Sequence, residues 1–190
     1  MTTQSVNYKG PMGMRIIKAF IDASATWGAN TVIWHFARIL QDVRLGDNVS
    51  IGGGTEIGRG SIVGDGTRIG ANCFLPPNSV IGKNVFIGPG VIFTDDKYPY
   101  IHDASDPPYE ALPPRVMDGA VIGAGAKIGP GVTIETDARV AMGAVVTNDV
   151  VEYSMVKSPI AARQRPMPAE WEPKSWTEIQ SEKLRQARQA

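Results

Sequence analysis

The chain has 190 residues, with 19 Lys and Arg against 19 Asp and Glu, so its net charge of zero gives it no general attraction to nucleic acid. This length suits one domain with an extension. The first twenty residues lack the continuous apolar segment of a secretory signal, and no run approaches the roughly 18 apolar residues of a membrane-spanning helix.

Cys73 is the single cysteine, and it has no partner in the chain for a disulfide. A lone cysteine is typical of proteins in a reducing compartment. We therefore expect a cytoplasmic protein that neither inserts into a membrane nor binds nucleic acid.

Residues 1–20 precede a repeat that begins at Ile21, after which an apolar residue recurs every six positions. The pattern runs to Phe93, stops, and resumes at Val116. Such a strict period is the mark of a repeat architecture. The apolar positions are Ile21, Trp27, Ile33, Ile39, Leu45, Ile51, Ile57, Val63, Ile69, Leu75, Ile81, Ile87 and Phe93, and then Val116, Ile122, Ile128, Ile134, Val140 and Val146.

The fifth position of each six-residue unit is always small or β-branched, as at Thr55, Cys73 and Ala126, and glycine favours the second position. This pattern predicts a short strand and a sharp turn in each unit, with the apolar residue inside and the small one beneath the corner. Three units close one triangular coil of eighteen residues, and stacked coils pair as parallel strands about 4.8 Å apart. The sequence therefore predicts an all-β solenoid, a parallel β-helix.

Two segments break the repeat. Residues 94–115, rich in Pro, Asp and Tyr, predict a protruding loop, and a long insertion in a compact repeat is usually functional. Residues 157–190 follow the last unit, and the capping box from Ser175 to Glu178 predicts a helix there. We divide the chain into an N-terminal extension (1–20), a β-helix domain with its loop (21–156) and a C-terminal extension (157–190).

Hexads this regular over residues 21–165 resemble the hexapeptide-repeat acyltransferases, a family of left-handed parallel β-helices. Three segments are similar to a subgroup that N-acetylates amino-sugar nucleotides for O-antigen and related glycans: Ile33–Phe36, Asn84–Pro89, and Phe93–Asp95 ahead of a Pro-containing loop. The resemblance implies a homotrimer that binds acetyl-CoA as co-substrate between two subunits and acetylates a nucleotide-linked amino sugar. We expect no metal, because the zinc-dependent carbonic anhydrases of this fold use three histidines and this chain has two.

Two other functions remain open at this point. One is O-acetylation of a sugar or small alcohol with His102 as the base. The other is a non-catalytic β-helical scaffold, although a scaffold has no evident need for the loop.

The resemblance also indicates where the co-substrate binds. Residues 140–153 are similar to the last coils of the family, which run along bound CoA. Gly125 and Gly143 are eighteen residues apart, so they are expected to stack on one corner and let a ligand approach the backbone. A turn requirement would also explain glycine there. Lys157 and Arg163 follow the last coil and are candidates for contacts to the CoA phosphates.

The candidate catalytic residues are Asp95 and His102. His102 lies beside Asp103, and a histidine with a carboxylate neighbour suits a general base, although a solvated loop histidine is the alternative. Asp95 stands where the subgroup has Asn, so it is expected to hold the acceptor's ammonium or to accept its proton; a carboxylate that caps a turn is the alternative. Further candidates for substrate binding are His35, Asn84, Asp96 and Tyr98. Cys73, at the small fifth position, is interpreted as packing.

Overall fold

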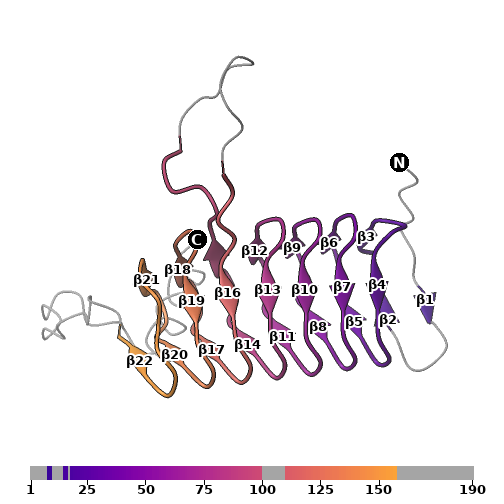
Figure 1. The fold of residues 1–190 in the computed structure, drawn as a ribbon. Helices are drawn as coiled ribbons and strands as arrows, with labels where there is room; N and C mark the ends of the chain where they lie inside the picture. The colour runs from indigo at the N-terminus through magenta and orange to yellow at the C-terminus, as the bar shows by residue number, and fades with distance from the viewer. Residues whose placement is uncertain (1–7, 10–14, 17, 100–109, 158–190) are drawn as a thin grey trace, which may run out of the picture. The chain divides into compact units, whose positions relative to one another are not determined.

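The computed structural model describes residues 8–9, 15–16, 18–99 and 110–157, which form a parallel β-helix of two-residue strands (Figure 1). No helix occurs among the described residues, and the all-β solenoid predicted from the repeat is confirmed. These residues belong to one compact unit, Met1–Pro159. The second unit, Ile160–Ala190, and with it the helix predicted within 157–190, lies outside the described residues.

Three sheets form the sides of the solenoid, and neighbouring strands in each are parallel except for the antiparallel pair β1–β2. Sheet A contains β1 (Tyr8–Lys9), β2 (Arg15–Ile16), β5 (Val32–Ile33), β8 (Ser50–Ile51), β11 (Arg68–Ile69), β14 (Phe86–Ile87), β17 (Val121–Ile122), β20 (Arg139–Val140) and β22 (Met155–Val156). Sheet B contains β3 (Phe20–Ile21), β6 (Arg38–Ile39), β9 (Glu56–Ile57), β12 (Phe74–Leu75), β15 (Ile92–Phe93), β18 (Lys127–Ile128) and β21 (Val145–Val146). Sheet C contains β4 (Thr26–Trp27), β7 (Arg44–Leu45), β10 (Ile62–Val63), β13 (Val80–Ile81), β16 (Arg115–Val116) and β19 (Thr133–Ile134).

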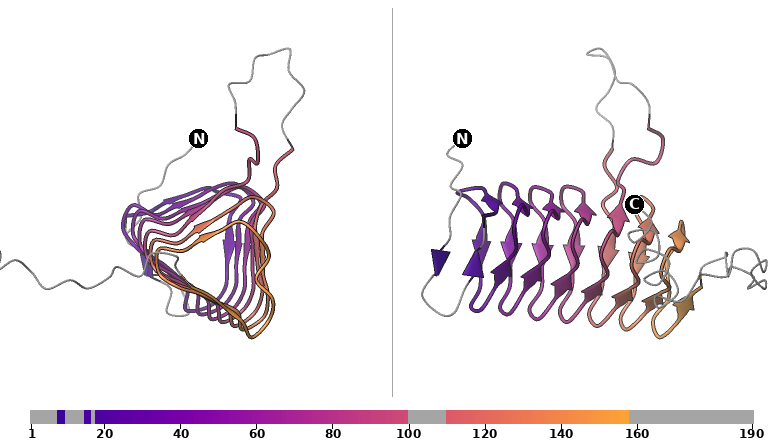
Figure 2. Two further views of the ribbon diagram at one scale, coloured as in Figure 1. Left: turned by 90° about the vertical axis from the view of Figure 1, so that its left-hand side faces the viewer. Right: turned by 180° about the vertical axis from the view of Figure 1, so that it is seen from behind.

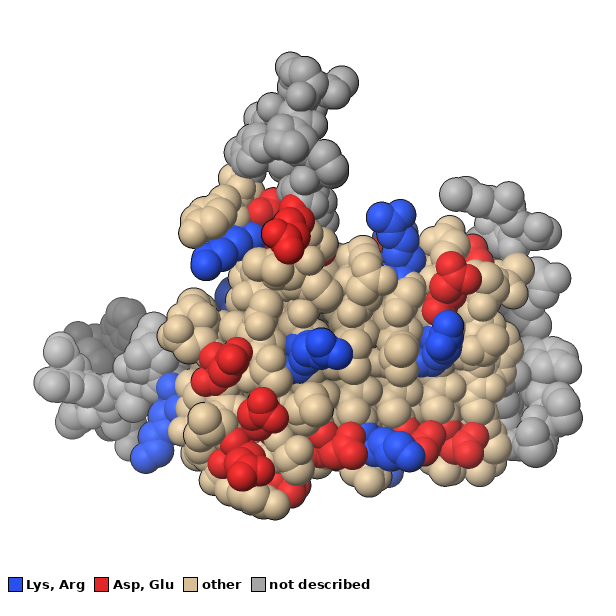
Figure 3. All heavy atoms as spheres, viewed as in Figure 1, with Lys and Arg blue, Asp and Glu red and all other residues tan. Residues whose placement is uncertain are grey.

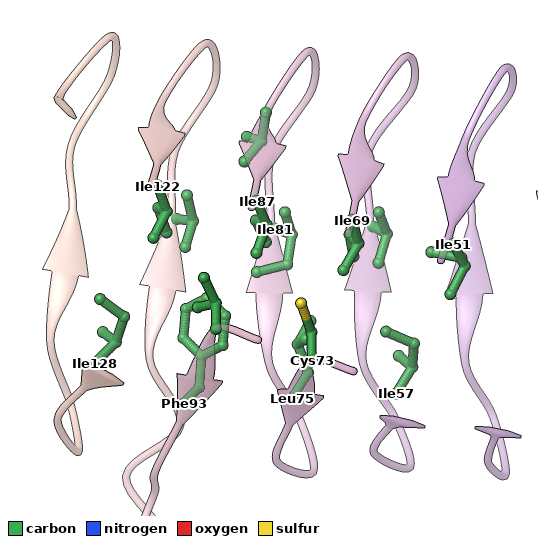
Figure 4. Close-up of a cluster of buried hydrophobic side chains, with 14 of the residues drawn as sticks. Ile51, Ile57, Ile69, Cys73, Leu75, Ile81, Ile87, Phe93, Ile122 and Ile128 are labelled. Carbon is green, nitrogen blue, oxygen red and sulfur yellow. The ribbon is translucent and has the colours of Figure 1, made fainter. Parts of the chain in front are cut away.

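The interior is a stack of aliphatic side chains, because the second residue of every strand from β5 to β21 is buried. Ile51, Ile69 and Ile87 are register partners along sheet A and are all at most 3% exposed. Figure 4 shows them beside Leu75 and Phe93 of sheet B. Burial of one such side chain is worth about 1.5–3 kcal/mol relative to exposure, so the row of apolar residues stabilises the whole solenoid.

The prediction that Trp27 lies in the interior is wrong, since its side chain is 36% exposed. Trp27 belongs to β4, which is the edge strand of sheet C at its N-terminal end. In the described residues, no further strand covers it on the N-terminal side. Phe93, which directly precedes the loop, is by contrast fully buried.

The small fifth positions form a hydrogen-bonded ladder beneath the corners. The hydroxyl of Thr55 donates to the carbonyl of Gly70 (2.7 Å) and accepts from the N–H of Cys73 (3.1 Å). Cys73 continues the ladder, with its Sγ 3.2 Å from the carbonyl oxygen of Gly88. Burial raises the pKa of the Cys73 thiol, which is consistent with a packing role for this side chain.

Three corners join the sheets, as the axial view in Figure 2 shows. The loop corner connects sheet B to sheet C, and the protruding loop leaves from it (Figure 2). The corner between sheets A and B is called the glycine corner and contains residues 34–36, 52–54, 70–72, 88–90, 123–125 and 141–143. The corner between sheets C and A is called the acidic corner and contains residues 28–30, 46–48, 64–66, 82–84, 117–119, 135–137 and 151–153.

Candidate functional site

Three consecutive coils expose bare backbone at the glycine corner. Gly90, Gly125 and Gly143 have φ angles of 69°, 68° and 67°, and the last two stack as the sequence predicts. Their N–H groups donate to the coil before: Gly125 to the carbonyl of Pro89 (2.9 Å) and Gly143 to that of Ala124 (2.8 Å). A Cβ atom built on any of the three glycines would meet no atom of the described residues within 4 Å. We call Gly90, Gly125 and Gly143 the open track.

A turn requirement does not by itself explain glycine in the open track. Asn72 and Asn84 occupy equivalent turns with φ of 55° and 54°, so asparagine also satisfies this backbone conformation. At Gly54 and Gly66 glycine is needed for a second reason, because an added Cβ would collide with the Oδ1 of Asn72 or Asn84 from the next coil. Neither the turn nor a side chain from the next coil requires glycine in the open track. Close approach of a ligand to the backbone would explain glycine at these positions.

The acidic corner is closed by its own side chains. The N–H of Asp47 donates to Asp65 Oδ1 (3.0 Å), and that of Lys83 donates to Asp118 Oδ1 (2.7 Å). Lys83 Nζ also lies 3.0 Å from Asp65 Oδ2. The hydrogen bond from Lys83 is the largest cause of the lowered pKa of Asp65, and its counterpart raises the pKa of Lys83. Figure 3 shows acidic side chains with a basic one among them along the lower edge of the solenoid.

The glycine corner has no such charges where the acidic corner has aspartates. The middle residues of its turns are uncharged from the second coil on: Gly53, Ala71, Pro89, Ala124 and Met142. Pro89 has no N–H, and no carboxylate of the corner is available to accept from the N–H groups of the other four residues, whereas those of Asp47 and Lys83 are capped. Uncapped donors beside bare backbone suit a ligand that carries amide and carbonyl groups.

The base of the loop lies directly beyond the open track along the chain. Gly90 is followed by β15 of sheet B, which ends at Phe93. Thr94 and Asp95 come next in the chain. The N–H of Leu112 donates to the carbonyl of Asp95 (2.8 Å), and the N–H of Gly131 donates to that of Leu112 (2.7 Å). Leu112 thus lies between Asp95 and Gly131 in the stack of turns at the loop corner, where the loop interrupts the repeat. Asp96 Oδ1 accepts from the N–H of Tyr98 (2.9 Å), so this carboxylate caps a turn at the loop base.

The structure brings some of the predicted site residues together and separates others. Asp95, Asp96 and Tyr98 lie at the loop base, and Gly125 and Gly143 lie on the open track. His102 and Arg163 lie outside the described residues, whereas Lys157, the last described residue, is exposed.

His35 and Asn84 lie further away within one chain. His35 is exposed at the first turn of the glycine corner, with its ring centroid 6.2 Å from that of Phe36. Asn84 lies on the acidic corner, so a single chain does not bring it to the loop base or to the open track. Gly90 belongs to the open track and was missed from the sequence.

No group of three or more His, Cys, Asp or Glu side chains suited to a metal ion occurs among the described residues. A helix long and apolar enough to cross a membrane is likewise absent from the described part of the chain.

The family model of the bacterial hexapeptide-repeat transferases (six repeats) matches residues 28–59, 60–95 and 113–148, which together make up more than half of the chain. The chain belongs to this family. The sequence-based prediction of an acyltransferase is therefore confirmed at the level of the family.

Solved structures with a similar course of the chain include three transferases. A hexapeptide transferase family protein from Anaplasma phagocytophilum is 25% identical over 74% of this chain and 70% of its own, with a TM-score of 0.45. The acetyltransferase domain of PglB from Neisseria gonorrhoeae is 18% identical over 76% of this chain and 54% of its own (TM-score 0.37). PerB from Caulobacter crescentus, solved with CoA and GDP-perosamine, is 22% identical over 73% of this chain and 50% of its own (TM-score 0.34).

The chain thus spans about half the length of the PglB and PerB structures. A search of curated protein sequences gives no match.

Proposed function

We propose that this acyltransferase moves an acetyl group from acetyl-CoA to the amino group of a nucleotide-linked amino sugar, in the biosynthesis of surface polysaccharide of the O-antigen type. We propose further that it acts in the cytoplasm as a homotrimer. The observation that carries the proposal is the open track, which leads along β15 to the loop base in a member of a transferase family.

Acetyl-CoA would lie along the open track. Its pantetheine arm is uncharged and contains two amides, so it suits a corner without charged side chains and with uncapped backbone donors. The absence of side chains at Gly90, Gly125 and Gly143 allows close approach to the backbone. Lys157 and Arg163, which follow the last coil, would meet the phosphates, so that the thioester faces the Gly90 end.

The acceptor would lie at the loop base. Attack on the thioester requires a neutral amine within about 3–3.5 Å of the carbonyl carbon. In the reaction the new C–N bond forms, the C–S bond breaks, the amine loses a proton and CoA leaves as the thiol. Asp95 would hold the acceptor's ammonium and accept its first proton to give the neutral amine, and the second proton would pass to the sulfur of CoA, with His102 as the second candidate base.

A homotrimer would place this region between two subunits. Sheet B, which links the open track to the loop base, exposes apolar side chains to solvent: Phe74 is 39%, Ile92 41% and Val145 58% exposed. Exposed apolar side chains on a flat face favour association with a second copy. Light scattering at micromolar concentration would give the mass of a trimer, and the mass of one chain would refute the assembly.

The decisive experiment offers the full chain acetyl-CoA with a panel of amino-sugar nucleotides and matched hydroxyl sugars, and follows the products by mass. We expect a gain of one acetyl group on an amino-sugar nucleotide. Acetylation of hydroxyl sugars alone would assign O-acetylation instead. Failure to bind acetyl-CoA at all would refute the proposal.

A further inference from the structure

We propose that Asn72 ends the open track and, together with Phe74 and Ile92, forms a small apolar acyl site that restricts the donor to acetyl-CoA and its shortest homologues. This inference rests on the proposed function, because it assumes that a CoA thioester lies on the open track.

The side chain of Asn72 closes the glycine corner on the N-terminal side of Gly90. A Cβ atom on Gly54 would collide with Asn72 Oδ1 and lie 3.5 Å from its Cγ, so the carboxamide lies over the Gly54 turn. At the corresponding positions on the other side, Gly90, Gly125 and Gly143, no atom of the described residues lies above the backbone. We call the third residues of the turns at the glycine corner, 36, 54, 72, 90, 125 and 143, the column. A linear ligand that follows the column from Gly143 therefore meets its first side chain at Asn72.

The face beside this end of the track is apolar. Phe74 and Ile92 are register partners on β12 and β15, and their side chains are 39% and 41% exposed. The pair is bounded by charge on both sides along sheet B. Glu56, bound to Arg38 at 2.6 Å, precedes it, and the exposed Lys127 follows it. These two side chains thus provide apolar surface at the level of the track's end, where a short acyl chain would lie, and Lys127 separates them from the exposed Val145.

The size of the site follows from the coil spacing. One coil step along the corner is about 4.8 Å, so an acyl group that extends past Gly90 by this length reaches the turn of Asn72, whose carboxamide lies over the following Gly54 turn. Glycine at position 72 would extend the bare backbone through Gly54, and the next side chain of the column would be Phe36, which is 65% exposed. The length of acyl chain that the protein accepts is therefore set by a single side chain.

Two substitutions shift the end of the open track in opposite directions along the glycine corner. Asn72→Gly removes it, and glycine is already used at this turn elsewhere in the column. Gly90→Asn moves it one coil toward the C-terminus, with the backbone angle that Asn72 already adopts at φ 55°. Asn48→Gly is the matched control, because Asn48 has φ 56° at the same turn position of the acidic corner.

The measurement is calorimetric binding of CoA, acetyl-CoA, butyryl-CoA and hexanoyl-CoA to the full chain. We expect the natural protein and Asn48→Gly to bind acetyl-CoA at least about tenfold more tightly than hexanoyl-CoA, the low end of what an apolar pocket discriminates. Asn72→Gly should reduce this ratio to below about threefold, and Gly90→Asn should weaken acetyl-CoA more than CoA.

The outcomes separate the two proposals. If CoA itself does not bind, the proposed function is refuted. If CoA binds but the natural protein shows no preference for acetyl-CoA over hexanoyl-CoA, the acyl site is refuted while the co-substrate site stands. The same holds if Asn72→Gly leaves the preference unchanged, or if Asn48→Gly removes it equally.

Discussion

The glycine corner and the acidic corner are built on the same backbone but differ in what stands outside it. Both turn with positive φ at equivalent positions, as at Asn72 and Asn84. At the acidic corner, carboxylates of one coil cap the N–H groups of the preceding coil, and the Lys83–Asp65 pair ties two coils together. At the glycine corner, no side chain of the described part of the chain covers Gly90 or Gly125. Side chains of the acidic corner thus hold its coils together, whereas the backbone of the glycine corner stays uncovered at these two positions in the described structure.

Beneath the surface the two corners are alike. Thr55 under the glycine corner donates to the carbonyl of Gly70 (2.7 Å), and Thr67 under the acidic corner donates to that of Gly82 at the same distance. Each hydroxyl also accepts from an N–H of the next coil, at 3.1 Å. A solenoid can therefore change the chemistry of one edge without changing the ladder that holds its coils together.

The largest effect is expected where a bulky side chain is placed on the open track. Gly125→Phe should weaken acetyl-CoA binding about 100-fold, or about 2.7 kcal/mol, because the ring occupies the path of the pantetheine. Phe36 adopts φ 62° in the same column, so the backbone accepts this residue type at a cost of about 1–2 kcal/mol. Binding is measured by calorimetry and folding by circular dichroism.

The matched control puts the same ring on the acidic corner. Asn48→Phe changes an equivalent turn with φ 56°, and we expect acetyl-CoA affinity to stay within about twofold of the natural value. An equal loss of affinity in both variants would show that the two corners do not differ in function. Unchanged affinity in folded Gly125→Phe would place the co-substrate elsewhere.

A smaller effect is expected from the carboxylate of Asp95 at the loop base. Asp95→Ala should lower the transfer rate at least about tenfold, or about 1.4 kcal/mol of barrier, with acetyl-CoA affinity little changed. Asp47→Ala removes a carboxylate of the acidic corner and should leave the rate unchanged. Steady-state rates with the acceptor identified by the panel test this, and equal rates for both variants would remove Asp95 from the reaction.

The sequence alone predicts the coil because every six-residue unit repeats the same physical requirement. Ile51 and Ile69 must be apolar to fill the interior, and Thr55 and Cys73 must be small to fit beneath a corner. Trp27 obeys the same rule in the sequence but lies at an end of the solenoid, where the strand that would cover it is absent from the described residues. Periodicity contains no information about which coil is terminal.

The candidate site was predicted only in part, because the loop shifts the register. Gly125 and Gly143 are separated by eighteen residues and are readily recognised as stacked. Gly90 stacks with Gly125 at a separation of 35 residues, as Lys83 does with Asp118. The eighteen-residue spacing of the repeat therefore does not reveal Gly90 as a member of the open track. Asn84 is a predicted substrate-binding residue because Asn84–Pro89 resembles the subgroup, but its turn lies at another corner than the loop.

A still smaller effect is expected at the acidic corner, and it depends on pH. The lowered pKa of Asp65 means that its contribution to stability is present above the unfolded value of about 3.9 and is lost as pH falls through the folded value. The raised pKa of Lys83 means that its contribution is present below about 10.4 and is lost as pH rises through the folded value.

Asp65→Asn should therefore lower the melting temperature modestly at neutral pH, because it removes one partner of an exposed ion pair. The difference from the natural protein should close as the pH approaches 3. Acetyl-CoA affinity should not change. A difference in melting temperature that is the same at pH 3 and pH 7 would show that the charge of Asp65 contributes nothing.

The smallest effect is expected inside the glycine corner, at Cys73. This thiol is the one nucleophile of its kind in the chain and lies directly beneath the turn of Asn72, so a role in transfer has to be tested. Cys73 is 2% exposed, and burial raises the pKa of its thiol. Its Sγ lies near the carbonyl of Gly88, just as the Thr55 hydroxyl donates to the carbonyl of Gly70. A serine hydroxyl can make the same hydrogen bond, so Cys73→Ser should change the transfer rate less than about twofold, well under 1 kcal/mol of barrier. If Cys73→Ser abolishes transfer in a protein that still melts cooperatively, while Asp95→Ala keeps full activity, the reaction takes place inside the corner and not on its surface.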